Sequence, residues 1–258
     1  MSKRGKLICV EGIDGSGKST VVRKVVEELV RNYSIATAVT REPTNGPIGK
    51  LIREYLNGVK TARDPYTIQL LMRADRLEHL ADNGIGIRKM LNGGINVICD
   101  RFMLSSVVYG TYQSCPTVDL GLENEDYLTS ETQMQKSYND IYEEHKSFVQ
   151  SVSQELNANL TELIRCPEND LINDMYTIHL IVSPDVAIER INKRSSETGE
   201  SISIYEDKEK LEKLFNTYNV ATQLLRGSGF NVIDVNAAKD EDEVYKEVLS
   251  HIKNIISL

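Results

Sequence analysis

The run GIDGSGKST at residues 12–20 constrains the fold of this chain more than any other stretch. It matches the pattern G-x-x-x-x-G-K-[ST] and follows a short apolar, β-rich run at residues 6–10. A glycine loop between a strand and a helix points backbone N–H groups at a phosphate, and the dipole of the helix adds to the attraction. The pattern therefore predicts an α/β protein that binds a nucleoside triphosphate. We expect Lys18 to reach the β- and γ-phosphates and Ser19, where the helix is expected to begin, to ligate Mg²⁺.

Strand and helix patterns alternate along most of the chain. Apolar, β-rich runs predict strands at residues 6–10, 35–40, 96–100, 176–182 and 231–235. Apolar residues with helical spacing predict helices at residues 21–30, 48–56, 67–80 and 184–194, and near the end of the chain from residue 244. Nearly continuous apolar strands are typical of a parallel sheet that is covered on both faces. The sequence predicts one domain over residues 1–258, a P-loop NTPase-type three-layer sandwich with a five-stranded parallel sheet.

An acidic segment at about 111–170 interrupts this alternation and divides the core into residues 1–110 and 171–258. Residues 110–170 hold 12 Asp and Glu against 3 Lys and Arg, so this stretch carries −9 of a total net charge of −8. Helical spacing of apolar residues predicts one or two amphipathic helices there, with apolar positions at Ile141, Phe148, Val152, Leu156, Leu160 and Leu163. Two interpretations stay open: helices that pack on the body of the protein, or a surface that binds a subunit or a partner.

Composition excludes several classes of protein. An acidic surface segment argues against nucleic acid as a partner. No apolar run approaches the ~20 residues that a membrane span needs, and the apolar run near the N-terminus fits a first strand better than a signal peptide. The four cysteines follow no metal spacing, and Cys9 and Cys99 lie in predicted strands, where we expect buried thiols. We expect a reducing, cytoplasmic location.

Other P-loop classes lack their signatures here. A guanine-reading N-K-x-D pattern is absent, because Asn192-Lys193 is followed by Arg194-Ser195. The third predicted strand ends in Asp100-Arg101 and not in the paired acids that are usual in a motor ATPase. An acid can orient Mg²⁺ or its water, and an arginine can hold a phosphate with two parallel hydrogen bonds. This pair favours a phosphotransferase.

Four further segments, in this order with the glycine loop, resemble the thymidylate kinase family. They are TREP (40–43), LLMRADRLEH (70–79), DRFMLSSVVYG (100–110) and IYE (204–206). The resemblance covers roughly residues 1–110 and 176–258 and leaves out the acidic segment. It implies transfer of the γ-phosphate of ATP to dTMP, with ATP and Mg²⁺ as cofactors, by a homodimer that forms through helices flanking the sheet.

The resemblance also implies roles for individual residues. Asp14 would approach the 3′-hydroxyl of the acceptor sugar and the transferring phosphate; an acid that stabilises the loop turn is the alternative. Arg101 would hold the acceptor phosphate, Arg76 would contact the pyrimidine, and Tyr109 would pack on the sugar. The other acceptor-site residues that it implies are Glu42, Pro43, Arg53, Met72, Ser105 and Ser106.

A lid is expected at about 190–206, where Ser, Gly and charged residues are frequent. Some family members have a catalytic arginine inside the glycine loop, where this chain has Gly15. The arginine is therefore expected from the lid, with Arg194 and Arg190 as the candidates and Lys193 as a weaker one. Arg194 is placed with the catalytic residues, and Arg190 is also expected to contact the nucleotide. The residues expected to hold the phosphates of ATP are Gly12, Gly15, Ser16, Gly17, Lys18, Ser19, Thr20 and Arg190, and those expected to hold the metal are Ser19 and Asp100.

Two residues depart from the family pattern. Met72 stands where a phenylalanine often stacks on thymine, and Gly110 stands where many bacterial members have glutamine. They leave open a kinase with another acceptor, such as dUMP or a modified pyrimidine nucleotide. A second alternative is a catalytically silent, ATP-binding regulatory or scaffold protein that binds a partner through its acidic helices.

Overall fold

The structure is a computed structural model that describes residues 4–64, 66–81, 85–114, 150–158, 170–199 and 206–258. A five-stranded sheet with the order β2-β3-β1-β4-β5 lies at its centre. All four pairs of neighbouring strands are parallel. The strands are β1 (Leu7–Glu11), β2 (Thr37–Arg41), β3 (Asn96–Asp100), β4 (Met175–Ile181) and β5 (Asn231–Asn236). Each lies within two residues of its predicted position.

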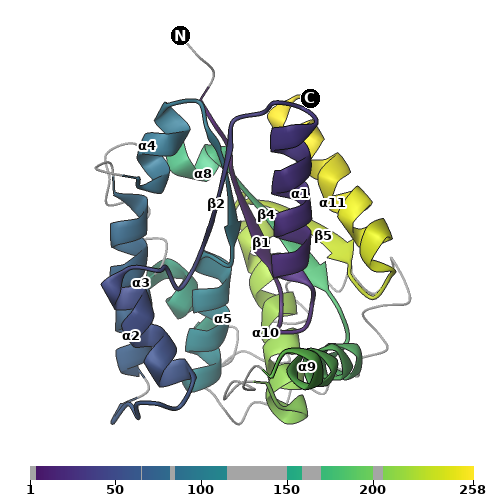
Figure 1. Ribbon diagram of the computed structural model, residues 1–258. Helices are drawn as coiled ribbons and strands as arrows, with labels where there is room; N and C mark the ends of the chain where they lie inside the picture. The colour runs from purple at the N-terminus through teal and green to yellow at the C-terminus, as the bar shows by residue number, and fades with distance from the viewer. Residues whose placement is uncertain (1–3, 65, 82–84, 115–149, 159–169, 200–205) are drawn as a thin grey trace.

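Helices cover both faces of the sheet (Figure 1). Helix α1 (Lys18–Arg31) packs against α11 (Glu241–Ile256) on one face, and α5 (Met103–Ser114) packs against α10 (Lys208–Gly227) on the other. The predicted α/β sandwich with a parallel sheet is confirmed. The remaining helices are α2 (Pro47–Leu56), α3 (Tyr66–Leu80), α4 (Ile87–Asn92), α8 (Asp170–Asp174) and α9 (Pro184–Thr198).

The central strand explains why the sheet holds together. All five residues of β1 are buried, and four of them are the apolar run LICV. Burying an aliphatic side chain stabilises a fold by about 1.5–3 kcal/mol, so this strand fixes the centre of the protein. Cys9 and Cys99 lie side by side on β1 and β3 as buried free thiols, as expected. Cys115 and Cys166 lie outside the described residues.

Several helices are not predicted by the sequence analysis: α4, α5, α8 and α10. Helix α10 carries apolar residues at helical spacing that are all buried, namely Leu211, Leu214, Phe215, Tyr218, Ala221 and Leu225. The periodicity was therefore present, within a strongly charged stretch that begins KEKLEK. Helix α1 begins at Lys18, one residue before the expected start.

Helix α9 continues four residues beyond its predicted end at residue 194. It ends at Thr198, and Gly199 follows in the left-handed region with φ 70°. A residue without a side chain adopts this conformation with no steric cost, which fits a helix stop. The first half of the predicted lid is thus helical, and residues 200–205 lie outside the described residues.

Residues 150–158 are the described part of the acidic segment between α5 and α8, and they are helical. Val152 and Leu156 are buried and belong to the hydrophobic core. This helix packs on the body of the protein, as the first interpretation expects. The other predicted apolar positions, Ile141, Phe148, Leu160 and Leu163, lie outside the described residues, so a partner surface there stays a prediction.

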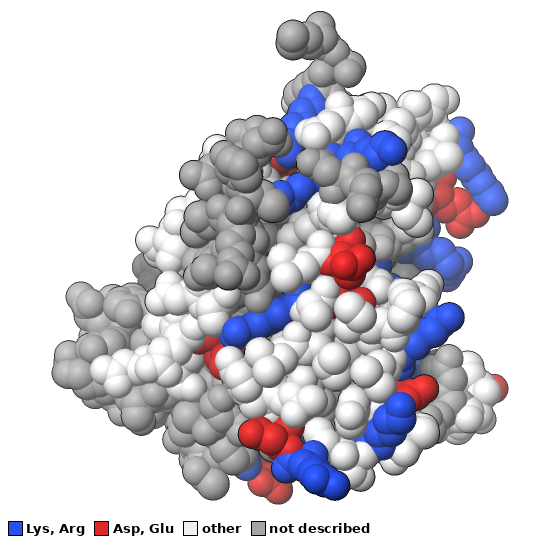
Figure 2. Space-filling model, turned by 90° about the vertical axis from the view of Figure 1, so that its left-hand side faces the viewer, with Lys and Arg blue, Asp and Glu red and all other residues white. Residues whose placement is uncertain are grey.

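The surface over α2, α3 and α4 carries broad uncharged areas. These helices form the left-hand side of Figure 1, and Figure 2 faces that side. Lysines, arginines and acids are scattered there between wide stretches of other residues. Among the described residues, no helix is both long enough and apolar enough to cross a membrane.

Candidate active site

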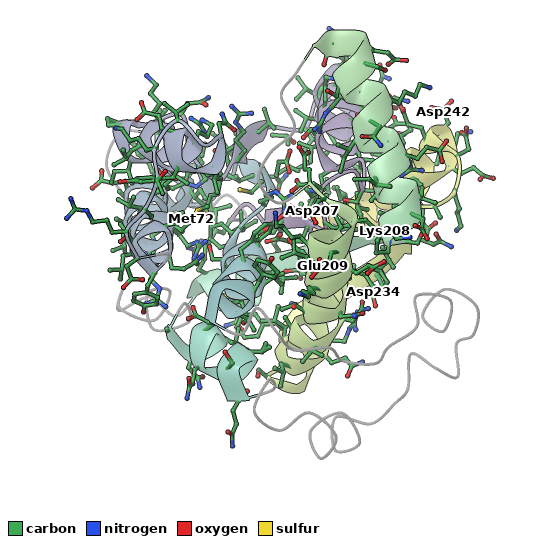
Figure 3. The ribbon with its side chains drawn as sticks, turned by 90° about the horizontal axis from the view of Figure 1, so that it is seen from below. Met72, Asp207, Lys208, Glu209, Asp234 and Asp242 are labelled. Carbon is green, nitrogen blue, oxygen red and sulfur yellow. The ribbon has the colours of Figure 1, made fainter. Side chains whose placement is uncertain are left out.

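The carboxyl ends of the strands place the glycine loop beside Asp100 and Arg101. Strands β1 and β3 are neighbours, with Val10 opposite Asp100, so the segments that follow them start side by side. Figure 3 views the molecule from this lower edge. Gly15 has φ 79°, and a Cβ there would lie 2.4 Å from the carbonyl oxygen of Ala187 on α9. Only glycine fits this position, since α9 passes directly over the loop.

A cleft of about 880 Å³ opens over the loop. Its lining includes Gly15, Ser16, Gly17, Lys18, Ser19, Thr20, Asp100, Arg190 and Arg194. It therefore brings together the residues predicted to hold ATP, apart from Gly12, and both predicted metal ligands. Gly12, at φ 144°, lies at the start of the loop, where a Cβ would be 2.6 Å from the carbonyl oxygen of Leu180.

Lys18 is a buried cation at the floor of this cleft. Its Nζ donates to the carbonyl oxygen of Ile13 at 2.6 Å and to Ser16 Oγ at 3.3 Å. The pKa of Lys18 is lowered to about 8, first by burial and second by the nearby Arg101, and the negative charge of Asp14 only partly opposes this. The ammonium group of Lys18 is thus hydrogen-bonded to neutral oxygens. A bound anion, such as a phosphate, would stabilise its charged form.

Ser19 and Asp100 form the pair predicted to bind a metal. The hydroxyl of Ser19, on the first turn of α1, donates to Asp100 Oδ2 at 2.5 Å. Ser19 lies on α1, the helix that follows β1, and Asp100 is the last residue of the neighbouring strand β3. Two oxygen ligands this close together are the kind of pair that Mg²⁺ uses.

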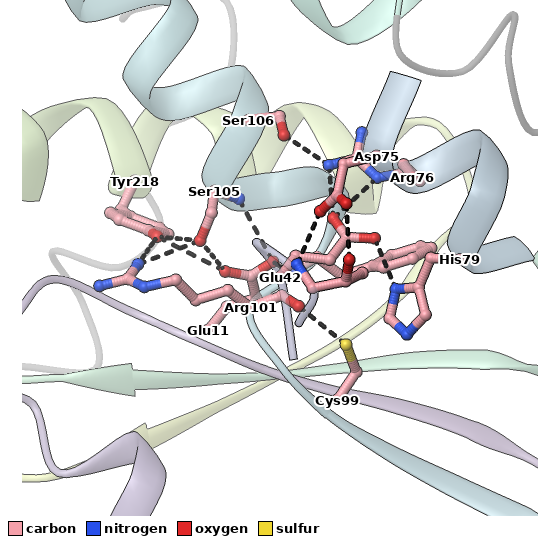
Figure 4. Close-up of polar contacts among 12 residues, drawn as sticks. Glu11, Glu42, Asp75, Arg76, His79, Cys99, Arg101, Ser105, Ser106 and Tyr218 are labelled. Carbon is pink, nitrogen blue, oxygen red and sulfur yellow. Dashed lines mark hydrogen bonds and ion pairs between the residues drawn. The ribbon is translucent and has the colours of Figure 1, made fainter. Parts of the chain in front are cut away.

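Arg101 lies at the junction between the loop and α5 (Figure 4). It adopts φ 66°, an unusual value for a residue with a side chain. Its Nη1 donates to the carbonyl oxygen of Gly12 at 3.0 Å, and to Ser105 Oγ and Tyr218 OH at 3.1 Å each. Its Nη2 forms an ion pair with Asp14. The guanidinium is therefore fixed before any substrate enters.

Asp14 lies between Arg101 and Tyr109 and lines both the cleft and the site beside it. One carboxylate oxygen pairs with Arg101, and the other accepts a hydrogen bond from Tyr109 OH at 3.0 Å. Burial raises the pKa of Asp14, but Arg101 and Lys18 outweigh burial, so the pKa lies below its usual value and the group is ionised. The loop acid thus lies toward α5, among the residues predicted to bind the acceptor.

Glu11 and Tyr218 belong to this network, and the sequence analysis does not single them out. Glu11, the last residue of β1, accepts from the backbone N–H of Phe102 at 2.8 Å and from Ser105 Oγ at 2.5 Å. Ser105 Oγ lies 2.8 Å from Tyr218 OH (Figure 4). The sequence signal that could have identified Glu11 is its position as a charged residue directly after the apolar run LICV. Tyr218 could be identified only once helix α10 was predicted.

A second, smaller cavity of about 190 Å³ adjoins the cleft. Leu56, Ile68, Met72 and Phe102 give it apolar walls, while Gln69, Ser105, Ser106 and Tyr109 add polar groups. Met72 lies on α3, and Figure 3 shows it to the left of the start of α10. Apolar walls with a few polar groups are typical of a pocket for a flat organic ring.

The two hollows share Asp14, Glu42, Pro43, Arg53 and Arg101. Arg53, on α2, donates to the carbonyl oxygens of Pro43 at 2.7 Å and Thr44 at 2.6 Å, so it holds the turn between them. Arg53 also lines both the cleft and the cavity. The charged residues predicted for the acceptor thus gather where the hollows meet.

Arg76 lies behind the cavity wall. Its side chain is 0% exposed, and its Nε and Nη2 donate to Glu42 Oε2 at 3.0 and 2.8 Å. Its Nη2 also donates to Ser106 Oγ, while His79 Nδ1 lies 3.0 Å from the other oxygen of Glu42 (Figure 4). Arg76 does not line the cavity, so its predicted contact with the pyrimidine stays a prediction.

Helix α9 brings Arg190 and Arg194, the two arginines of the predicted lid, to the cleft. Arg190 Nη1 donates to the carbonyl oxygen of Ala237 at 2.9 Å, which places it beside the end of β5. Arg194 Nη2 donates to Glu206 Oε1 at 2.6 Å. Glu206 itself lines the smaller cavity, so this ion pair joins the two sides of the site.

Comparisons with known proteins agree with this geometry. The family model described as thymidylate kinase matches residues 10–129. The chain is 32% identical over 250 residues to a probable thymidylate kinase of Pyrobaculum calidifontis, with 97% of each chain covered. It is 28% identical over 249 residues to one of Methanocaldococcus jannaschii, with 96% of each covered. The solved thymidylate kinase of Candida albicans superposes with a TM-score of 0.62 at 25% identity, covering 98% of this chain and 93% of that one. The chain therefore belongs to the thymidylate kinase family.

Proposed function

We propose that this kinase binds ATP over the glycine loop and dTMP in the smaller cavity, and that it moves the γ-phosphoryl group between them at Asp14 and Arg101. The observation that carries the proposal is that both residues line both hollows. A phosphate at each side of this junction would lie near its partner without further rearrangement of the strands. Holding two reactants in line supplies much of the rate enhancement in such reactions.

The transfer needs no covalent intermediate on the protein. An oxygen of the acceptor phosphate forms a bond to the γ-phosphorus, the bond to the β,γ-bridging oxygen breaks, and ADP leaves. The second pKa of a phosphate monoester is about 6, so the attacking oxygen needs no base at neutral pH. The protein contributes position and charge: Arg101 holds the acceptor phosphate, and Lys18 stabilises the charge on the departing β-phosphate.

Asp14 has a separate role in this proposal. It is ionised and held between Arg101 and Tyr109, so it can accept a hydrogen bond from the 3′-hydroxyl of the acceptor. When the acceptor phosphate takes up donors of Arg101, Asp14 keeps the tyrosine and gains the sugar hydroxyl as partners. The hydrogen bond to the 3′-hydroxyl aligns the acceptor sugar. It also offsets the repulsion between the carboxylate of Asp14 and the nearby transferring phosphate.

Ser19 and Asp100 would hold Mg²⁺, which would neutralise charge on the phosphates. Both offer oxygen ligands, and they lie within hydrogen-bond distance of each other. Within the part of the chain that is described, no group of three His, Cys, Asp or Glu could hold a metal ion. This fits Mg²⁺, which usually keeps several waters and takes substrate phosphates as ligands beside one or two protein groups.

The lid arginines would complete the charge around the transferring group. Arg194 and Arg190 both line the cleft from α9, and Gly15 leaves no room for an arginine in the loop. We propose Arg194 as the catalytic arginine, because its ion pair with Glu206 directs it toward the acceptor side. An arginine at this point can contribute about 10³-fold or more to the rate.

The affinity for ATP is expected to fall as the pH rises through about 8. The pKa of Lys18 lies at about 8, below its ordinary value of 10.5, so the free protein loses this positive charge above pH 8. ATP binds the charged form, and its dissociation constant should rise by up to about tenfold for each further pH unit. Calorimetric titrations with Mg-ATP at pH 7.5 and 9.5 would measure this. A dissociation constant that stays flat over this range in the wild type contradicts the assignment, whereas in Lys18→Arg a flat profile is expected.

The acceptor is tested by comparing kcat/KM for dTMP, dUMP, dCMP, dAMP, dGMP and their ribose counterparts in a coupled ADP-release assay. We expect dTMP to be preferred, with Met72 and Phe102 covering the base. A preference for dUMP would support the alternative acceptor that Met72 leaves open. ATP binding without turnover of any acceptor would support a regulatory or scaffold role.

We also propose that the protein is a homodimer through the outer face of α3. Tyr66, Leu70 and Leu77 are 43%, 53% and 43% exposed, and their spacing places them on one side of this helix. Helix α3 lies on the side of the molecule that faces the viewer in Figure 2, where uncharged surface is broad. Exposed apolar patches of this kind mark interaction sites.

Replacing Leu70 by lysine is expected to convert the dimer to a monomer, since a charge in a self-complementary apolar interface is repeated in both subunits. Light scattering coupled to size exclusion measures the mass. Val59→Lys, also at an exposed apolar position, is the matched control and should leave the mass unchanged. A monomeric wild type would contradict the proposal.

A further inference from the structure

The helix at residues 150–158 brings an acidic side chain to α3, the helix that supplies Ile68, Gln69 and Met72 to the wall of the smaller cavity. Glu155 comes from the acidic segment, and its side chain is only 10% exposed. Its Oε2 accepts a hydrogen bond from Arg73 Nη2 of α3 at 3.3 Å. Val152 and Leu156, one turn before and one residue after, are buried in the core. The helix is therefore fixed on the body, with Glu155 directed at α3.

Gly110 on α5 makes room for this contact. A Cβ at position 110 would lie 2.8 Å from Glu155 Oε2 and 3.1 Å from Gln69 Oε1. Such distances are too short for a real side-chain carbon, so the carboxylate and the amide both occupy the space that a side chain would take. Three segments, α3, α5 and the helix 150–158, thus converge on Gly110.

Gln69 connects this convergence with the acceptor cavity. It lines the cavity and is 3% exposed, and Ile68 and Met72 on the same helix line the cavity with it. Gln69 and Arg73 are four residues apart and therefore lie on one side of α3. Glu155 binds Arg73 and lies beside Gln69, so it also fixes the part of α3 that forms the cavity wall with Ile68 and Met72.

Burial makes the contact sensitive to any change. Burial raises the pKa of Glu155, while the positive charge of Arg73 opposes that rise. Arg73 is 16% exposed, so neither partner can turn fully to water if the other is removed. Loss of one member leaves the other charge poorly solvated beside the cavity wall.

We propose that Glu155 is a positioning residue of the acceptor site: it fixes Gln69 and Arg73 of α3 against Gly110 of α5 and so sets the shape of the cavity that takes the pyrimidine deoxynucleotide. This inference rests on the proposed function. It gives the acidic segment a role in acceptor binding, in addition to packing on the body.

The first test is Glu155→Gln, which keeps the size of the side chain and removes its charge. KM for dTMP should rise about tenfold, the size expected for the loss of one charge-assisted hydrogen bond. KM for ATP should stay within about twofold, because Glu155 does not line the nucleotide cleft. Glu27→Gln removes an exposed ion pair with Arg31 on α1 and should leave both KM values unchanged.

The second test is Gly110→Ala, alone and together with Glu155→Ala. The new methyl group meets the ends of two flexible side chains, so the variant is expected to fold while displacing them. KM for dTMP should rise in the single Gly110→Ala variant. The same change should have a smaller effect in the Glu155→Ala background, where one of the two obstacles is gone.

The outcomes separate this inference from the proposed function. If the wild type does not phosphorylate dTMP, the proposed function fails. If the wild type is active and a folded Glu155→Gln keeps its KM for dTMP within about twofold, the positioning role is wrong; a parallel rise of both KM values also overturns it. Thermal melting shows whether Glu155→Gln folds. If it does not fold, the Gly110→Ala variant decides, and an unchanged KM for dTMP in that variant overturns the proposal.

Discussion

Replacing Arg101 by alanine is expected to lower kcat/KM for dTMP by about 10³-fold or more. The guanidinium contacts Gly12, Asp14, Ser105 and Tyr218 together, so its loss removes the proposed partner of the acceptor phosphate and a partner of Asp14. Asp14 then becomes a buried acid with one fewer counter-charge, which repels the incoming phosphate. Steady-state kinetics with varied dTMP and saturating ATP measure the change.

Two further variants make this result specific. Arg101→Lys keeps the charge but not the forked donors, and it should recover only part of the activity. Arg53→Ala should be less damaging than Arg101→Ala, because Arg53 spends two donors on the turn at Pro43 and Thr44. A folded Arg101→Ala variant with activity within about tenfold of the wild type would contradict the role given to Arg101.

Replacing Lys18 by alanine is expected to abolish measurable turnover, with a loss of about 10³-fold or more in kcat. Lys18 is the cation at the floor of the cleft, and its Nζ is held only 2.6 Å from the carbonyl oxygen of Ile13. Bound phosphates would draw it out of this contact and would gain its charge. The variant should also bind ATP more weakly, which calorimetry separates from the effect on kcat.

Lys24 offers the matched control on the same helix. It forms exposed ion pairs with Glu241 and Asp242 and does not line the cleft. Lys24→Ala should keep its kinetics close to those of the wild type, since exposed ion pairs contribute little. If Lys18→Ala and Lys24→Ala had similar kcat values, the phosphate-binding role of Lys18 would be wrong.

The strands were predictable because each is a short, nearly uninterrupted apolar run. Residues 96–100 match β3 to the residue, and the glycine loop follows β1 directly as expected. Helix α10 was missed although its buried residues have helical spacing, because charged residues dominate its first turns. Tyr218 could not be predicted without it, since its contact with Arg101 joins residues 117 positions apart.

Within the site, residue types were predictable, but their partners were not. The sequence does not distinguish Arg101, which lines both hollows, from Arg76, whose donors are taken by Glu42 behind the wall. That difference depends on how α3 packs against the turn after β2. Likewise, the loop acid Asp14 is explained only when the ends of β1 and β3 are seen together, because their pairing brings Arg101 to it.

The acidic segment shows the same limit at larger scale. Its charge predicts a surface helix, and helical spacing at Val152 and Leu156 predicts which side is buried. Neither indicates that Glu155 meets Arg73, because this pair depends on the space that Gly110 leaves on α5. A glycine in the middle of a helix is a weak signal until its neighbours are known.

The measurement that tests the central claim most directly is the fate of labelled phosphate from [γ-³²P]ATP with dTMP and Mg²⁺, followed by separation of the nucleotides. The account predicts that label appears in dTDP, in step with ADP, that little inorganic phosphate is released, and that Lys18→Ala transfers none. Label that appears only as inorganic phosphate, or no transfer by a folded wild-type protein that binds both nucleotides, would contradict the claim that the two hollows join a donor and an acceptor at Asp14 and Arg101.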